Sequence, residues 1–240
     1  MLLRADLPEV CAGFTTRANG GDFAGNLAYH VGDRAENVDH WRAELERQVG
    51  PLSWMTQVHG TTVIDAGSDT PEADGLVVRR GQGGAVMVAD CAPLLLLGTA
   101  GAEVTAGAVV HVGRAGLLGG IAHQAVAALR DTGAGTVSAV IGPAICGSCY
   151  EVGETMAAEA ERVLPGSSCV TRWGTPGIDI PASLARQLRE SGVDVDVWDM
   201  CTMEDERFFS HRRQAGQAGR FAGFLVLNRD TPDRLDLDVL

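Results

Sequence analysis

The sequence contains no apolar run long enough to cross a lipid bilayer. Its longest apolar stretch covers residues 92–98, whereas a spanning helix needs ~20 apolar residues. Residues 1–6 also lack the basic start and the long apolar segment of a signal peptide. We therefore expect a soluble, cytoplasmic protein that has no membrane partner.

Basic charge is also scarce. The chain has 19 Lys and Arg residues against 31 Asp and Glu residues, which gives a net charge of −12 at pH 7. An acidic chain is repelled by the phosphate backbone of nucleic acids, so we do not expect a nucleic-acid partner. A small anionic ligand can still bind where arginines converge locally.

Internal repeats, low-complexity tracts and recognisable linkers are absent from the 240 residues. Hydrophobic residues make up 45% of the chain, which is enough for one core of normal size, so we expect a single domain spanning 1–240. The six cysteines are expected to be reduced thiols, some of them metal-binding or catalytic, because a chain of this size needs no disulfide support.

Four segments have the periodicity of amphipathic helices. Asp33 can cap the first, and the second begins just after Gly116. The third covers 154–164, and the fourth has Pro181 in its first turn and ends near Gly192. Short β-branched segments predict strands at 61–64, 76–78, 85–88, 93–97, 105–110, 136–141, 193–198 and 221–227. Because these elements follow no regular βαβ rhythm, they favour an α/β layered sandwich over a Rossmann or TIM fold.

Three polar residues stand at the ends of apolar strands: His59, Cys91 and His111. Strand ends are where layered α/β folds place their chemistry. Two imidazoles and one thiolate suit zinc or copper, and three protein ligands leave a fourth position open. Their spacings match no local metal motif, so two hydrogen-bonded histidines and a buried thiol remain an alternative interpretation.

Cys146 and Cys149 form a second candidate, a CxxC pair. Nucleobase deaminases pair P-C-x-x-C with an upstream H-x-E, and this chain has no His-x-Glu. A structural zinc would need a second pair of ligands, for which only Cys201 and His211 are spare. A redox pair or two plain buried thiols are the other interpretations.

The segment 201–213 places dense charge beside two phenylalanines. Such a segment is typical of a solvated turn. The alternative is that Arg212 or Arg213 points into a cleft and holds an anion.

Several short segments, taken together, resemble the YfiH-like family, whose members are often labelled laccase-domain or polyphenol-oxidase proteins. They cover nearly the whole chain: TTR at 15–17, NL at 26–27, HVGD at 30–33, Trp54, QVHG at 57–60, ADG at 73–75, ADCAPL at 89–94, IGP at 141–143, YEVG at 150–153, FFSHRR at 208–213 and GR at 219–220. Each segment alone is a weak signal, but their number and order make chance agreement improbable.

The resemblance implies a four-layer α/β/β/α sandwich with mixed sheets. It implies zinc, or copper, bound by His59, Cys91 and His111. It also implies a purine nucleoside phosphorylase acting on adenosine, inosine, guanosine and methylthioadenosine, with adenosine deaminase activity. Its partners would be a purine nucleoside and phosphate, and we expect a monomer or weak dimer.

Further roles follow for other residues of these segments. Phosphorolysis needs cationic groups around phosphate and a proton for the departing base. The candidate clamps are Arg17, Arg212 and Arg213. The candidate acid–base groups are Asp90, Glu151 and Cys149, and Asn26 and Gln57 could orient the ligand.

One departure from the family pattern lies beside the third metal ligand. Where the family has His-Ala-Gly-Trp-Arg-Gly, this chain has Arg114 in place of the Trp and Ala115 in place of the Arg. The departure bears on phosphorolysis rather than on the metal ligands.

Three other functions stay open at this point. One is a hydrolase-type factor that edits peptidoglycan precursors, and another is a binding module without activity. The third is a polyphenol oxidase. A multicopper oxidase needs about ten histidine ligands, and this chain has six His and no His-x-His, so it could hold a single copper only.

Overall fold

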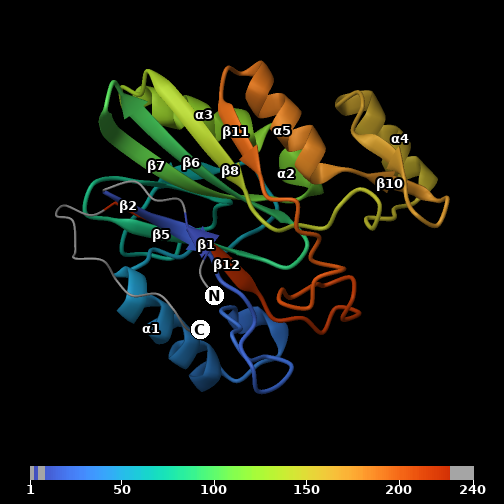
Figure 1. The fold of residues 1–240 in the computed structure, drawn as a ribbon, viewed down its shortest axis with the longest axis horizontal. Helices are drawn as coiled ribbons and strands as arrows, with labels where there is room; N and C mark the ends of the chain where they lie inside the picture. The colour runs from blue at the N-terminus through green and yellow to red at the C-terminus, as the bar shows by residue number, and fades with distance from the viewer. Residues whose placement is uncertain (1–2, 5–8, 228–240) are drawn as a thin grey trace.

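The computed structural model describes residues 3–4 and 9–227, and within them two β-sheets face each other with helices on both outer sides (Figure 1). The larger sheet has the strand order β11-β8-β6-β7-β4-β3. In that order its strands are Asp194–Val197, Thr136–Ile141, Ala92–Ala100, Glu103–Val112, Gly75–Val78 and Val63–Asp65. The two outer pairs are parallel and the inner pairs antiparallel, so the sheet is mixed.

The smaller sheet has the order β1-β2-β12-β5 and is antiparallel throughout. Its strands are Leu3–Arg4, Val10–Phe14, Phe221–Leu227 and Gly83–Val88. A separate antiparallel pair, β9 (Ser168–Val170) and β10 (Pro176–Ile178), packs against helix α4 (Glu154–Val163).

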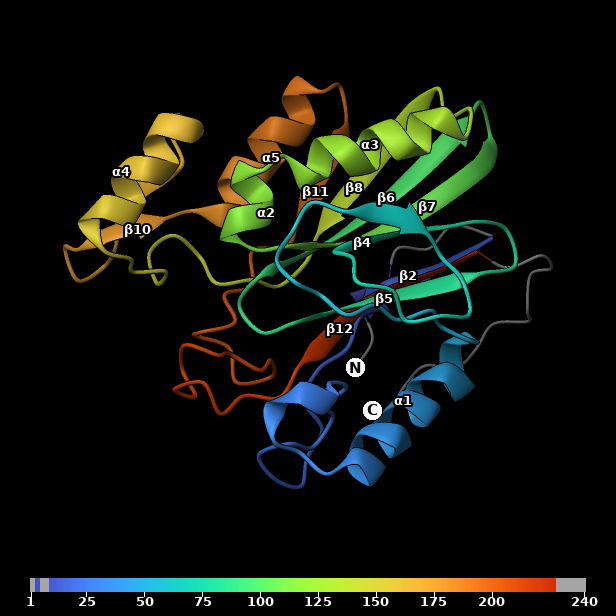
Figure 2. The same cartoon turned by 180° about the vertical axis from the view of Figure 1, so that it is seen from behind.

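Helices complete the outer layers. The outer face of the larger sheet is covered by α2 (Arg114–Leu118), α3 (Ile121–Asp131) and α5 (Ile180–Glu190), as Figure 2 shows from the opposite side. Helix α1 (Ala35–Val49), which follows a short 3-10 helix at Tyr29–Val31, covers the smaller sheet. The predicted four-layer α/β/β/α sandwich with mixed sheets is therefore confirmed.

Strand β6 shows how the layers are held together. Leu94 and Leu96 pack under the helices, whereas Leu95 and Leu97 point into the space between the two sheets. Successive side chains of a strand point to opposite faces, so a continuous leucine run marks a strand that is buried on both sides.

The helix expected just after Gly116 begins earlier, at Arg114, and is two helices. Gly120 adopts a φ of 78° and separates α2 from α3, a backbone conformation that glycine tolerates without steric penalty. The helices predicted at 154–164 and from Pro181 are confirmed, and the second of these is capped by Asp179, whose carboxylate accepts a hydrogen bond from Ala182 N at 3.0 Å.

The predicted cap of the first helix was wrong. The N-cap of α1 is Arg34, and it makes no side-chain capping bond. The Asp33 carboxylate instead accepts hydrogen bonds from the side-chain amides of Asn26 and Asn37, at 2.9 and 2.7 Å. Asp33 therefore joins the loop at Asn26 to the first turn of α1, rather than capping the helix.

All eight predicted strands are present with small changes at their ends, while β1, β2, β9 and β10 were not predicted. Across residues 3–4 and 9–227, no helix combines the length and the apolar character needed to span a membrane. The expected domain limits of 1–240 stay a prediction, because 1–2, 5–8 and 228–240 lie outside the described residues.

Candidate metal centre

Sheet register brings two of the predicted metal ligands together. Cys91 stands immediately before β6, and His111 is the last residue but one of β7. These strands are antiparallel, with Pro93 opposite His111 and Ala92 opposite Val112. The start of one strand thus meets the end of the other, which places the thiol beside the imidazole.

The third ligand, His59, is brought in by a loop that is tied to the neighbouring strand. The backbone N–H groups of His59 and Gly60 donate to the Asp74 carboxylate at 3.0 and 2.6 Å. Asp74 directly precedes β4, where Gly75 pairs with Val110 of β7. The loop therefore ends beside His111, 52 residues further along the chain.

The three side chains form one compact group. The ligand atoms of His59, Cys91 and His111 all lie within 4.8 Å of one another, and Cys91 Sγ is 3.8 Å from His59 Nε2. The two imidazole rings are 4.6 Å apart and nearly perpendicular, at 81°. His111 is buried, Cys91 is half-buried and His59 is exposed, so solvent and ligands reach the group from the His59 side.

Asp74 fixes the orientation of His111. Its carboxylate is fully buried and accepts a hydrogen bond from His111 Nδ1 at 2.7 Å. This bond places the proton on Nδ1 and leaves Nε2 free as a ligand atom, an arrangement that recurs around protein-bound metals. Backbone donors and His111 outweigh the effect of burial and lower the pKa of Asp74, so it stays ionised.

The electrostatics of the group favour a thiolate. Burial alone would raise the pKa of the Cys91 thiol, but His111 and His59 beside it lower that pKa to about 6. Burial would likewise lower the pKa of His111, but Cys91 and Asp74 raise it to about 9. A thiolate is the form of cysteine that binds metals, and the metal would displace the proton from His111.

The backbone around the group is shaped to receive a small ion. His59 has a φ of 60° and Asp90, next to Cys91, has a φ of 92°, a region that residues other than glycine seldom adopt. Gly113 leaves room that a side chain would take, since a Cβ there would lie 2.8 Å from His59 Cδ2 and 3.2 Å from Cys91 Sγ. The donor set, the fixed tautomer and this space fit one zinc or copper ion.

Of the predicted phosphate clamps, Arg212 lies next to the group and keeps free donors. Its backbone N–H donates to Asp90 Oδ2 at 2.7 Å, and its Nη1 donates to the carbonyl of Glu151 at 2.9 Å. Its guanidinium lies 5.3 Å from the ring centroid of Tyr150, and the side chain is exposed.

Arg213 is placed differently. Its half-buried guanidinium donates to the carbonyls of Thr202, Asp205 and Phe208, and so holds the preceding loop together. Arg17 stacks on Phe209 with 5.1 Å to the ring centroid, and its buried Nε has no hydrogen-bond partner within the described part of the chain.

The two predicted orienting residues are engaged inside the protein. Asn26 uses both amide hydrogens and both lone pairs of its oxygen, on Asp33, Ala28 and Arg220. Gln57 makes two hydrogen bonds to the backbone of Met87, at 2.7 and 2.8 Å. Both amides therefore position the loops of the site, and Asn26 has no group left for a ligand.

The three predicted acid–base residues do not converge on one point. Asp90 accepts from Thr202 Oγ1 and from Arg212 N, each at 2.7 Å. Glu151 is exposed. Cys149 is buried in a second group with Cys146, Cys201 and Glu204, where burial and the neighbouring thiols raise its pKa.

Sequence reasoning missed three residues of the site. Asp74 was recognised only as part of a motif, and Tyr150 and Arg220 were given no role. Burial raises the pKa of Tyr150, and Cys91 raises it further while Arg114 and Arg212 lower it. Arg220 is half-buried and attracted by Cys91 and Asp90. The periodicity of single strands carries no signal for these contacts, because each one joins distant segments.

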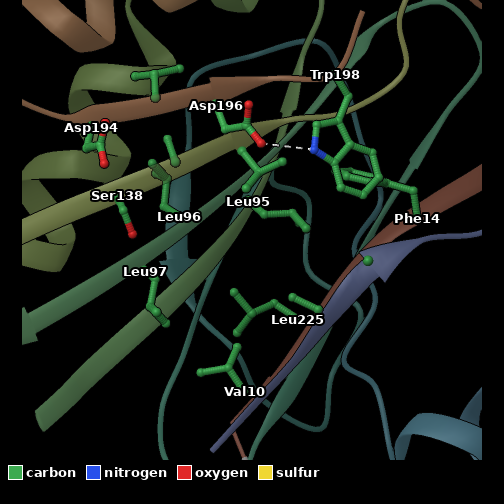
Figure 3. A pocket seen from close by; sticks show the side chains of 15 residues that line it. Val10, Phe14, Leu95, Leu96, Leu97, Ser138, Asp194, Asp196, Trp198 and Leu225 are labelled. Atoms are coloured by element: carbon green, nitrogen blue, oxygen red, sulfur yellow. Dashed lines mark hydrogen bonds between the residues drawn. The ribbon is translucent and has the colours of Figure 1, made fainter. Parts of the chain in front are cut away.

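A cavity of about 430 Å³ lies elsewhere, at the open end between the two sheets (Figure 3). It is lined mainly by apolar residues such as Val10, Phe14, Leu95 and Trp198, and the indole N–H of Trp198 donates a hydrogen bond to Asp196. None of the predicted site residues lines it.

The match to known families agrees with this geometry. A family model described as multi-copper polyphenol oxidoreductase laccase matches residues 11–228. The chain belongs to this laccase family. The expected resemblance is also confirmed by solved structures, among them YfiH of Bacillus licheniformis, with a TM-score of 0.81 and 26% identity over 93% of this chain and 98% of that one.

Other known proteins are more similar to this chain in sequence or fold. YlmD from Geobacillus stearothermophilus has a TM-score of 0.83 and 28% identity, covering 95% of this chain and 96% of its own. A Mycobacterium tuberculosis relative named purine nucleoside phosphorylase is 42% identical over 212 residues, 83% of each chain. A Corynebacterium glutamicum relative of the same name is 40% identical over 235 residues, 90% of this chain and 94% of its own.

Proposed function

We propose that this chain is a metal-dependent purine nucleoside phosphorylase, with zinc bound by His59, Cys91 and His111. The observation that carries the proposal is the placement of Arg212, Arg114 and Arg220 around Cys91, Asp90 and Tyr150. This gathering of guanidinium groups stands out in a chain whose net charge is −12. The name carried by relatives about 40% identical supports it. The substrates proposed are adenosine, inosine, guanosine and methylthioadenosine, with phosphate as co-substrate.

Three arginines provide the site for an anion. Arg114 and Arg212 both act on the Tyr150 hydroxyl, which is also close enough to Cys91 to respond to it. Arg220 is attracted by the charges of Cys91 and Asp90. Guanidinium groups bind phosphate oxygens through paired N–H donors. Arg114, which stands where the family has a Trp, therefore takes part in the cationic rim.

In the proposed reaction a phosphate oxygen forms a bond to ribose C1′ while the bond from C1′ to the purine nitrogen breaks. The electron pair of the broken bond stays on the purine, which takes up a proton and leaves as the free base beside ribose 1-phosphate. Arg114, Arg212 and Arg220 orient the phosphate and offset its charge. Bound zinc would supply Lewis acidity at the open side of the site.

Glu151 is the proposed source of the proton. Its carboxyl group is exposed, and its own backbone carbonyl holds Arg212, so it lies at the rim formed by the arginines. Asp90, by contrast, uses both carboxylate oxygens to hold Thr202 and Arg212. We propose that Asp90 positions Arg212 rather than transferring the proton.

The donor set argues against multicopper oxidase chemistry. Among the described residues two groups of His, Cys, Asp or Glu could hold a metal ion, and the group at His59 is the one that contains histidine. A His₂Cys set can hold a single copper. Metal analysis of the purified protein by mass spectrometry decides between zinc and copper.

The test is to incubate the protein with adenosine or inosine, with and without phosphate, and to identify products by mass spectrometry. Free base and ribose 1-phosphate that form only with phosphate support the proposal. Inosine formed from adenosine without phosphate would identify a deaminase instead. No product in either case would leave peptidoglycan editing or a binding module, and would overturn the proposal.

Two variants make the test specific to the site. Cys91→Ala removes a metal ligand and should lose both bound zinc and phosphorolysis. Arg79→Ala is the control, because Arg79 pairs with Asp65 on an exposed surface at 2.9 Å and touches none of the site residues described.

A further inference from the structure

A second group of metal-binding side chains lies outside the His59 site. Cys146, Cys149, Cys201 and Glu204 each offer one ligand atom, and these atoms all lie within 4.8 Å of one another. Sulfur ligands of tetrahedral zinc are about 3.8 Å apart, given Zn–S bonds of about 2.3 Å. Shifts of roughly 1 Å or less would therefore close the group around an ion.

We propose that these four residues form a structural zinc site, distinct from the site at His59. The chain presents them on two short turns with the same spacing. Cys146 and Cys149 are three residues apart, and so are Cys201 and Glu204. Structural zinc sites are usually built from two ligand pairs of short spacing such as C-x-x-C. Here a carboxylate takes the fourth position, which Cys or His usually fills.

The backbone holds the two turns face to face. The N–H groups of Cys149 and Tyr150 both donate to the Cys146 carbonyl at 2.9 Å, which closes the first turn. The N–H of Glu204 donates to the Cys201 carbonyl at 3.0 Å, which closes the second. A parallel bridge between Ala144 and Cys201 joins them. The ligands are thus brought together by backbone contacts that do not depend on the metal.

The sulfurs have the surroundings of a metal thiolate site. The backbone N–H of Cys146 donates to Cys201 Sγ at 3.4 Å, the kind of bond that orients a ligand atom from the next shell. Cys149 is buried, and Cys146 and Cys201 are half-buried. All three cysteines of the group are free thiols, and so is the neighbouring Cys169.

Arg172 offsets part of the negative charge of the group. Three thiolates and a carboxylate around a divalent ion carry a net charge of −2, and a nearby cation offsets part of it. Arg172 pairs with Glu204 at 2.7 Å, and its backbone N–H donates to the Ser148 carbonyl inside the CxxC turn at 3.0 Å. With four protein ligands the site has no open position, which is typical of structural rather than catalytic zinc.

The proposed zinc would brace the arginine rim. The first turn follows Ile145, whose N–H donates to the Asp90 carbonyl at 2.9 Å. The second contains Thr202, whose hydroxyl donates to the Asp90 carboxylate. Both turns therefore contact the residue that fixes Arg212, next to Cys91. A Cys149 held by zinc is not available as an acid–base group, which removes it from that role.

The experiment counts metal ions. The full chain, purified under reducing conditions and incubated with excess zinc chloride, is desalted and analysed for zinc per chain. We expect about two in the wild type, about one in Cys201→Ser and about one in His59→Ala. Cys169→Ser is the matched control, because Cys169 Sγ donates to the Gly147 carbonyl beside the group without belonging to it, and it should keep two.

A second readout keeps the test decisive if the Cys201→Ser variant fails to fold. Cobalt loaded into His59→Ala should give the intense sulfur-to-cobalt absorption of a three-thiolate site, and Glu204→Gln should release zinc to a chelator at least ~10-fold faster. The proposal is overturned if His59→Ala binds no zinc or cobalt. It is equally overturned by two results found together. These are a disulfide within the group, seen by mass spectrometry without reductant, and a failure of the same protein to bind zinc after reduction.

Discussion

The Nδ1 atom of His111 lies 2.7 Å from a carboxylate oxygen of Asp74, and both side chains are buried. The same carboxylate also accepts hydrogen bonds from the backbone N–H groups of three consecutive residues, Val58, His59 and Gly60, the first at 3.3 Å. One side chain therefore sets the tautomer of one ligand and the position of another. The candidate metal site depends on Asp74 even though Asp74 does not belong to the ligand group.

Asp74→Asn should weaken zinc binding by ~10–100-fold. The amide cannot serve as acceptor to His111 and to the loop as the carboxylate does, so the imidazole loses its fixed orientation. The measurement is competition with a zinc chelator of known affinity, with circular dichroism to show that the fold is kept. Asp65→Asn, on an exposed strand end, is the control. An unchanged affinity in Asp74→Asn would contradict the role given to Asp74.

Gly113→Ala should weaken zinc binding at the His59 site by ~10-fold or more. The added methyl would lie 2.8 Å from His59 Cδ2 and 3.2 Å from Cys91 Sγ, so one ligand must move. The matched control is Gly153→Ala, because Gly153 has an ordinary extended conformation and a Cβ there has no neighbour within 4 Å. Equal zinc affinities in the two variants would show that the space at Gly113 is not needed.

Alkylation of Cys91 by iodoacetamide in metal-free protein should follow a pKa of about 6. The reactive form is the thiolate, whose fraction rises with pH, so the rate should increase through pH 6 and reach ~90% of its maximum at pH 7. An ordinary thiol with a pKa of ~8.5 would be only a few per cent ionised there. Peptide mapping identifies the alkylated cysteine, and zinc should protect it. A midpoint near pH 8.5 would refute the lowered pKa.

Replacing Arg212 and Arg213 should have different effects. Arg212→Ala should raise the KM for phosphate by ~10-fold, equivalent to about 1.4 kcal/mol, with little loss of stability. Arg213→Ala removes the guanidinium donor from three carbonyls, of which that of Asp205 keeps the Phe208 N–H, and should lower the free energy of unfolding by ~2 kcal/mol. Phosphate-dependent kinetics and urea unfolding of both variants check this. The assignment fails if Arg213→Ala is the variant that raises the KM without losing stability.

Much of the fold could be predicted because its signals are local. The apolar run of β6 marks a strand buried on both faces, and Pro181 marks the start of α5. The Gly119-Gly120 break and the role of Asp33 could not be predicted in the same way. A helix can continue through a glycine pair or break there, and tertiary packing decides which. Asp33 can cap a helix or bind the side chains of distant residues, and the fold decides which partners it meets.

The candidate site divides along the same line. His59, Cys91 and His111 could be singled out because each is a metal-binding residue at the end of an apolar strand. Cys201 could be named as a possible partner of the CxxC pair, but Glu204 could not, because a parallel bridge between Ala144 and Cys201, 57 residues apart in sequence, brings this turn there. The engagement of Asn26 likewise depends on Arg220, nearly the whole chain away.

The backbone at His59 and Asp90 has a consequence for laboratory evolution. Three described residues other than glycine have positive φ. Two of them belong to the candidate metal site: His59 is one of its ligands, and Asp90 precedes the ligand Cys91. Such a conformation costs about 1–3 kcal/mol in a residue with a side chain, and glycine would relieve it. At Asp90 the hydrogen bonds that its carboxylate accepts from Thr202 and Arg212 oppose such a change. A library selected for thermal stability alone should therefore accumulate glycine at position 59 and lose the metal, whereas selection that includes zinc retention should keep His59 and accept the less stable backbone.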